Sequence, residues 1–294
     1  MRNPTPIFRI IPALVALCIG LAPAALGQGA VGVQPNAVIL EVAPGGSVTQ
    51  ELRIDNPGSN PLGLTIYPGD WQLDGSDQIN YYPAETLERS AAGWLTLSAT
   101  DLSLASRANT TLTYTVQVPD SATAGTYWAA VFIEGVDPAT EGSQALAAFR
   151  LRTAHTFYIN VPPIQHAGSI LGIFGTPPQT PEQPYRMQLS YMNEGNTVQI
   201  LNGQIDIRTV TGELVDTVPV EREVALPGLV KSLNIALYGP LPASEYLALA
   251  VLNYGDFTRD VAAELVFEVP IDLAAPEFYF EGARERASTL DGTP

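Results

Sequence analysis

The sequence predicts an all-β protein with two consecutive immunoglobulin-like β-sandwich domains after a signal peptide. Three observations favour this fold class. Short segments with alternating apolar side chains recur along the chain, turns rich in Gly, Pro, Asn and Asp separate them, and no helical apolar period is long enough for a helix. The 294 residues include 25 glycines and 25 prolines, so turn-forming residues are frequent enough to punctuate two sandwiches of ordinary size.

The first 27 residues have the layout of a secretory signal peptide. Arg2 and Arg9 form a basic start, an apolar run follows from Ile10 to Leu21, and small residues precede a predicted cleavage after Gly27. The run is short for a membrane span, although an uncleaved anchor or a lipoprotein at Cys18 stays an alternative. We therefore expect a periplasmic or otherwise extracytoplasmic protein. Cys18 is the only cysteine, so the mature fold is expected to hold without disulfides.

The first domain is predicted to span 28–163. Its expected strands lie at 38–42, 48–54, 62–66, 79–82, 94–104, 110–118 and 126–133. The segment 126–133, TYWAAVFI, is apolar on both faces and should be a central strand. The segment 69–77, GDWQLDGSD, is predicted to be a loop that carries Trp71.

The stretch from Ala147 to Pro163 is the longest alternating segment of the chain. One face of the predicted strand carries Phe149, Leu151, Phe157, Ile159 and Val161, and the other carries Arg150, Arg152, Thr156, Tyr158 and Asn160. A double proline ends it, because proline cannot donate to a sheet ladder. We interpret this stretch as the last strand of the first domain and the hinge to the second.

The second domain is predicted to span 164–270 as another sandwich. Its expected strands lie at 170–174, 185–193, 205–207, 214–220, 233–237, 246–253 and 261–269. The remaining residues, 271–294, are mixed in charge and weakly patterned, so we expect a disordered tail, except that Phe278–Phe280 could dock on a sheet.

Composition and motifs argue against several classes of function. The formal net charge is −16, with 14 basic and 30 acidic residues, which does not favour nucleic acid as a partner. His155 and His166 are the only histidines and have no adjacent carboxylate pair, so no catalytic set is predicted and the protein is not expected to be an enzyme. Asp70, Asp74 and Asp77 lack the spacing of a calcium loop. No metal and no cofactor is predicted.

The stretch Phe149–Pro163 resembles the last strand of the first domain in PapD-like periplasmic pilus-assembly chaperones. Phe157-Tyr158 followed by Pro162 is similar to the family's ending, and Ala124-Gly-Thr-Tyr127 also looks like the family. The resemblance implies two immunoglobulin-like domains that hold an incomplete pilin by lending it a strand. It also implies a basic anchor for the subunit's carboxylate, at a position that His155 occupies here.

The layout is also similar to WxL-interacting cell-surface proteins, which have paired immunoglobulin-like domains and bind peptidoglycan and WxL-type partners. Two segments carry this second resemblance: Asn193-Glu-Gly195, an Asn-led turn, and Ser244-Glu-Tyr246, the start of a tyrosine strand.

Two hypotheses for function follow. The first is an exported, non-enzymatic protein, resembling an assembly chaperone, that pairs the edge strand Phe149–Val161 with a subunit of a surface or pilus structure. Its predicted partner-binding residues are Phe149, Arg150, Leu151, Arg152, His155 and Trp71. For His155, the sequence favours a partly buried strand position over a role in partner binding. The second hypothesis is an envelope module that binds cell-wall glycan through Trp71, Tyr81 and Tyr82.

Overall fold

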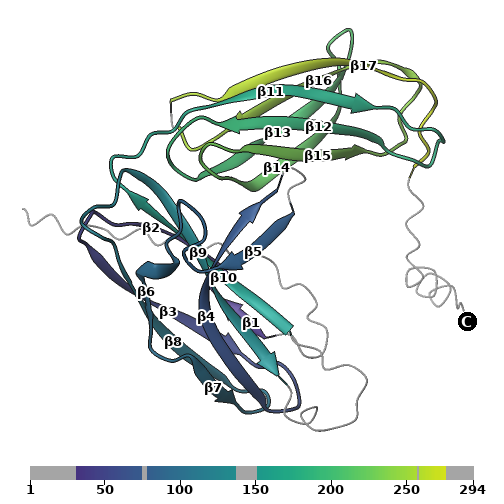
Figure 1. The fold of residues 1–294 in the computed structure, drawn as a ribbon. Helices are drawn as coiled ribbons and strands as arrows, with labels where there is room; N and C mark the ends of the chain where they lie inside the picture. The colour runs from purple at the N-terminus through teal and green to yellow at the C-terminus, as the bar shows by residue number, and fades with distance from the viewer. Residues whose placement is uncertain (1–30, 75–77, 137–150, 257, 276–294) are drawn as a thin grey trace, which may run out of the picture. The chain divides into compact units, whose positions relative to one another are not determined.

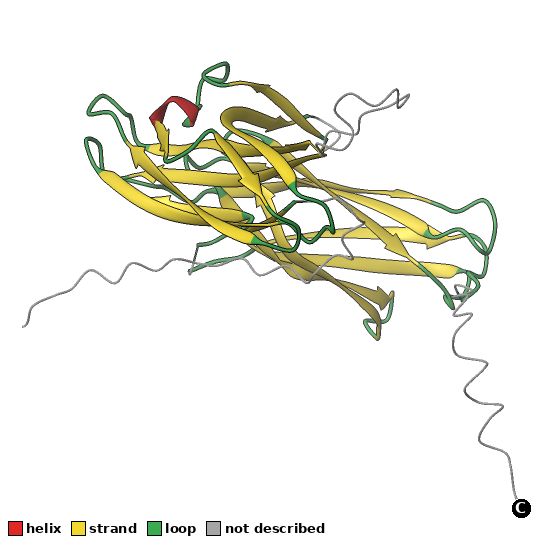
Figure 2. Ribbon diagram, turned by 90° about the horizontal axis from the view of Figure 1, so that it is seen from below, coloured by secondary structure: helices red, strands yellow, loops and turns green. Residues whose placement is uncertain are grey.

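The computed structural model describes residues 31–74, 78–136, 151–256 and 258–275. Over these residues the protein is built of strands, with one short 3₁₀ turn, η1 (Ala92–Trp94) (Figures 1 and 2). The predicted all-β fold class, two consecutive immunoglobulin-like sandwiches, is therefore confirmed. The chain divides into two compact units, Met1–Gln165 with Asn196–Val198, and His166–Gly195 with Gln199–Pro294.

The first unit contains strands β1 to β10. They are β1 (Gly32–Gln34), β2 (Ala37–Glu41), β3 (Ser47–Asp55), β4 (Leu62–Leu73), β5 (Ile79–Pro83), β6 (Leu95–Leu97), β7 (Asp101–Leu104), β8 (Asn109–Gln117), β9 (Gly125–Val136) and β10 (Leu151–Val161). One sheet has the order β1-β3-β8-β6, and the other has the order β2-β10-β9-β4-β5, with β7 also paired to β4.

The core of the first unit lies between these two sheets. Leu112, Tyr114 and Val116 alternate on β8 and are at most 1% exposed, and they pack in one cluster with Phe157 and Ile159 of β10. Alternation along a strand sends every second side chain to one face, which is why these residues share the core. The apolar face predicted for the long strand therefore faces the core at Phe157, Ile159 and Val161.

Two expectations for the first unit have clear outcomes. β9 pairs with β10 on one side and β4 on the other, so the prediction of a central strand at 126–133 is confirmed. The prediction of a loop at 69–77 is wrong for its first residues, because β4 continues to Leu73 and Trp71 pairs with Tyr81 of β5. Gly69 and Asp70 had suggested a turn, but both have packing roles within the strand.

The second unit contains strands β11 to β17. They are β11 (Gly168–Thr176), β12 (Tyr185–Asn193), β13 (Gln199–Thr209), β14 (Leu214–Ala225), β15 (Val230–Leu237), β16 (Ser244–Asn253) and β17 (Val261–Val269). One sheet has the order β11-β12-β15 and the other has the order β14-β13-β16-β17. Leu189, Ile205 and Leu252 are completely buried between them, in a core separate from that of the first unit.

The chain after β17 is ordered for a few residues beyond the predicted domain end. Leu273 is 4% exposed and forms an antiparallel bridge with Leu241, through hydrogen bonds of 3.2 and 2.8 Å. The predicted tail therefore begins with packed residues, and its part from residue 276 onward, with Phe278–Phe280, lies outside the described residues. The predicted signal peptide, 1–27, also lies outside them. Of the described helical segments, none has the length and apolar character needed to cross a membrane.

Candidate partner-binding edge

Strand β10 has a partner along its whole length on one side and along half its length on the other. It pairs antiparallel with β9 from Leu151 to Val161. On its other side it pairs parallel with β2, but only from Thr156 to Asn160. Over Leu151–His155, no strand in the described part of the chain pairs with that side. The prediction that Phe149–Val161 as a whole is an edge strand is thus corrected, because only the first half of β10 has a free side.

Two hydrogen bonds show which backbone groups face the free side. Thr156 N–H donates to the Asn36 carbonyl at 2.9 Å, and Val42 N–H donates to the Asn160 carbonyl at 3.0 Å. Both the N–H and the C=O of one strand residue point to the same side, and the side alternates along the strand. Even-numbered residues of β10 therefore face β2. By the same alternation, Arg152 and Ala154 direct their N–H and C=O groups to the free side.

The half-open edge arises because the N-terminal segment crosses from one sheet to the other between β1 and β2. β1 pairs with β3 in one sheet, and after Pro35 the chain continues as β2 in the other sheet, where it first reaches β10 at Thr156. Thr153 Oγ1 donates to the Val31 carbonyl at 3.0 Å, which holds this crossing against the inner face of β10. No described strand pairs with the backbone edge beside Arg152 and Ala154.

Arg152 is held on the outer face of the sheet by charge and by aromatic rings. Its guanidinium bonds Glu134 at 2.7 Å, and Glu134 also accepts the Tyr67 hydroxyl at 2.6 Å. The guanidinium lies 5.5 Å from the ring centre of Phe132 and 5.9 Å from that of Tyr81, within cation–π range. The hydrogen bond to Glu134 raises the pKa of Arg152. With 45% of its side chain exposed, Arg152 marks the free edge with a fixed positive charge.

His155 is completely buried and hydrogen-bonds the chain where it crosses from β1 to β2. Its Nδ1 lies 2.7 Å from the Pro35 carbonyl, and its Nε2 lies 2.8 Å from the Tyr114 hydroxyl. Because a carbonyl only accepts, Nδ1 carries the proton and Nε2 accepts from Tyr114. Burial lowers the pKa of His155 to about 4, so the ring is neutral at neutral pH. The geometry gives His155 a structural position and does not expose it to a partner.

Trp71 is also buried. It is 4% exposed, its ring meets Tyr158 edge-on at 6.0 Å, and its carbonyl accepts the Trp128 indole N–H at 2.8 Å. Tyr81 and Tyr82 on β5 are 47% and 38% exposed, but successive strand residues point to opposite faces. Trp71, Tyr81 and Tyr82 therefore do not form one exposed platform of the kind that the glycan hypothesis needs.

The other predicted contact residues are only partly visible. Phe149 and Arg150 lie outside the described residues. The backbone of Leu151 is described and pairs with Gly135. Sequence reasoning identified Arg152 but missed its supporting residues Tyr67, Phe132 and Glu134. The one sequence signal for them is that 126–133 is apolar on both faces. An apolar outer face of β9 must be covered by other side chains, and these residues and Arg152 lie on that face.

The described residues contain no group of three His, Cys, Asp or Glu side chains placed to hold a metal ion. What the edge offers is backbone hydrogen-bonding groups, flanked by one cation on the outer face. Such an edge is suited to pairing with an extended chain.

Known proteins that are similar to this chain are found among solved structures. No protein-family model and no curated protein matches the chain. Among solved structures, the class 5 fimbriae chaperone CfaA is 12% identical, with 82% of this chain and 100% of that chain covered and a TM-score of 0.44. The chaperone YadV is 11% identical, covering 81% and 99%, with a TM-score of 0.43. Both of these solved structures are chaperones, and their likeness to this chain is structural, at low sequence identity.

Proposed function

We propose that this protein binds an extended segment of a partner protein, which adds a strand to the free side of β10 at Leu151–His155. The partner would be a subunit of a surface or pilus structure, held before assembly in the periplasm or another extracytoplasmic compartment. The role is non-enzymatic and that of an assembly chaperone. The observation that supports it is the half-open edge, where no described strand pairs with the side to which Arg152 and Ala154 direct their N–H and C=O groups.

The free edge is short, and a short edge limits non-specific pairing with other chains while it still allows a specific partner to bind. Natural sheets protect edges with charges, prolines or short lengths. Here β2 covers Thr156–Asn160, and Arg152 places a cation beside the uncovered part. Main-chain hydrogen bonds would provide affinity, and side chains on alternate positions would provide selectivity.

The chaperone proposal is tested by changing the main chain at one position. A photo-crosslinking residue replaces Arg152 in the full chain, expressed in its native host, while position 154 carries Ala, Val or Pro. Ala154→Pro removes the outward N–H that an added strand would use, whereas Ala154→Val keeps it and has a higher strand propensity. We expect one discrete adduct with Ala or Val at position 154, and its loss with Pro.

The crosslinked protein identifies the partner class. An adduct with an exported β-rich surface subunit, through an extended alternating segment, is the expected result. Crosslinking that persists with Ala154→Pro, in a variant that remains folded, would place the partner elsewhere on the surface and overturn the proposal. Adducts only with unrelated abundant proteins would overturn the chaperone role as well.

A further inference from the structure

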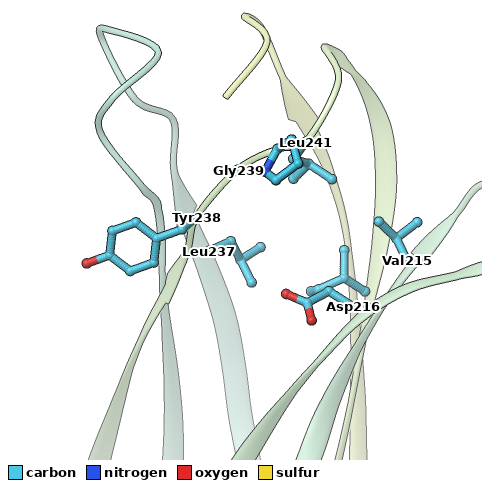
Figure 3. Close-up of a pocket in the computed structure, with 8 residues that line it drawn as sticks. Val215, Asp216, Leu237, Tyr238, Gly239 and Leu241 are labelled. Atoms are coloured by element: carbon cyan, nitrogen blue, oxygen red, sulfur yellow. The ribbon is translucent and has the colours of Figure 1, made fainter. Parts of the chain in front are cut away.

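A cavity lies at one end of the second sandwich, between its two sheets (Figure 3). It has a volume of about 260 Å³ and its walls come from both sheets. Ile207 and Val215 belong to one sheet, while Leu237 and Leu241 come from the end of β15 and the loop after it. Pockets for whole small-molecule ligands usually start at about 300 Å³, so this cavity fits a single bulky side chain better than a cofactor.

The cavity lies beside two strands that have no partner on one side. β14 pairs only with β13, and β15 pairs only with β12, among the described strands. At the opposite margin of the sandwich β11 lies against β17, whereas at this margin β14 and β15 contact each other more sparsely, with Lys231 of β15 paired to Glu223 of β14 at 3.1 Å. The cavity end is therefore the place where an extended segment can approach the core and also reach free strand edges.

The cavity carries a carboxylate on the core-facing side of its sheet. Asp216 lies directly opposite Ile207 in the β13–β14 register, and Ile207 is a completely buried core residue. Cross-strand partners project to the same face, so Asp216 points toward the space between the sheets, as Figure 3 shows. One of its oxygens accepts the Thr217 backbone N–H at 2.8 Å. No ion pair joins Asp216 to a basic residue that the structure describes.

Two of the residues that line the cavity are apolar or aromatic and exposed. Val215 is 41% exposed and Tyr238 is 52% exposed. A cluster of exposed apolar side chains around a hollow is typical of a protein interaction site. These two side chains and the carboxylate together favour a ligand with one apolar and one cationic group.

We infer that this cavity binds a peptide segment of a partner protein in which a bulky apolar residue is followed by Arg or Lys. The apolar side chain enters between Ile207, Leu237 and Leu241, and the cation pairs with Asp216. Charge complementarity supports a basic segment, since the whole chain carries a net charge of −16. This site belongs to the second unit and is independent of the free edge of β10.

Three capped hexapeptides test the inference on the full chain by amide chemical-shift mapping. They are identical except at the two central positions, which are Phe-Arg, Phe-Glu or Ala-Arg. We expect saturable shifts at Val215, Asp216, Leu237 and Gly239 with the Phe-Arg peptide, and at least fivefold weaker binding of the other two. Equal binding of all three peptides, or shifts confined to other residues, would overturn the inference.

Matched variants separate the two parts of the site. Asp216→Asn should reduce the affinity for the Phe-Arg peptide about two- to fivefold, as expected for the loss of a partly exposed ion pair. The affinity for the Phe-Glu peptide should not decrease. Val215→Arg should abolish binding of the Phe-Arg peptide, whereas Val266→Arg, at a 59% exposed position on β17, should not. Equal effects of the two Arg variants would contradict the site. Binding that appears only after removal of residues 276–294 would assign the cavity to the chain's own C-terminal segment and overturn the proposed partner.

Discussion

His155 shows how one buried side chain links the stability of the first unit to pH. Its pKa is about 4 in the folded protein because burial disfavours the charged ring, whereas an unfolded histidine has a pKa of about 6.5. Because its pKa is lowered on folding, neutral His155 makes its full contribution to the free energy of unfolding above pH 6.5. That contribution is lost as the pH falls from 6.5 toward 4, because the unfolded chain takes up the proton first.

This pH dependence gives the first prediction. Between pH 7.5 and pH 5, His155 alone should lower the free energy of unfolding by about 2 kcal/mol. His155→Gln keeps hydrogen-bonding capacity but does not titrate in this range, so its stability should fall less over the same interval. Urea denaturation of both proteins at the two pH values measures the difference. Equal losses in the wild type and the variant would show that His155 titrates normally in the folded state.

Gly69 is the second residue whose role is set by packing. A Cβ atom placed there would lie 2.6 Å from the ring of Phe132, which is itself 2% exposed and lies beneath the Arg152 guanidinium. Glycine is therefore needed for close approach in the middle of β4. Its neighbour Asp70 is buried and accepts hydrogen bonds from Thr86 N–H, Leu87 N–H and the Ser90 hydroxyl.

Gly69→Ala should destabilise the protein by about 1–3 kcal/mol, because the Phe132 ring must move out of a packed position. Phe132→Leu removes part of the ring and offers space for the new methyl group. We therefore expect the double variant to lose less stability than the sum of the two single variants. Thermal or urea unfolding of the four proteins measures this coupling, and strict additivity would contradict the contact.

At the level of elements, the two sides of β10 make a clear contrast. Odd-numbered residues direct their backbone groups to β9, and Ala154 directs its own to the free side. Thr153→Pro should therefore cost about 3 kcal/mol or more, because it breaks a ladder hydrogen bond, while Ala154→Pro should cost clearly less. Thr153→Val controls for the loss of the Thr153 hydroxyl, which bonds Val31. Urea denaturation giving equal costs for the two proline variants would show that the assigned orientation is incorrect.

The elements that the sequence predicted well are those in which local alternation and burial agree. β8, β12 and the inward face of β10 follow the period of two closely, because each faces a core on one side, while β9 is apolar along its length because both of its faces are buried. The extent of β4 was missed because Gly69 and Asp70 have the composition of a turn. Their partners, Phe132 and residues 86–90, are distant in sequence, so no local pattern reveals the strand.

At the level of the whole molecule, contacts between residues distant in sequence also limit what could be predicted of the candidate site. Arg152 was identified because it lies on the polar face of the long alternating strand that was predicted to pair with a partner. The half-open edge could not be found, since it depends on where β2 meets β10, a pairing between Ala37 and Thr156. The burial of His155 and Trp71 depends in the same way on non-local contacts with Pro35, Tyr114 and Tyr158. The two separate cores, by contrast, follow from the recurrence of alternating segments along the chain.

Amide hydrogen exchange at four consecutive residues of β10 tests the central claim most directly. In the free protein, the N–H groups of Thr153 and His155 should be protected by β9, while those of Arg152 and Ala154 should exchange at nearly unprotected rates. In the complex with the partner captured through position 152, prepared without the crosslinker, Arg152 and Ala154 should become protected at least a hundredfold. Strong protection of Arg152 and Ala154 in the free protein, or unchanged exchange in the complex, would contradict strand addition at this edge.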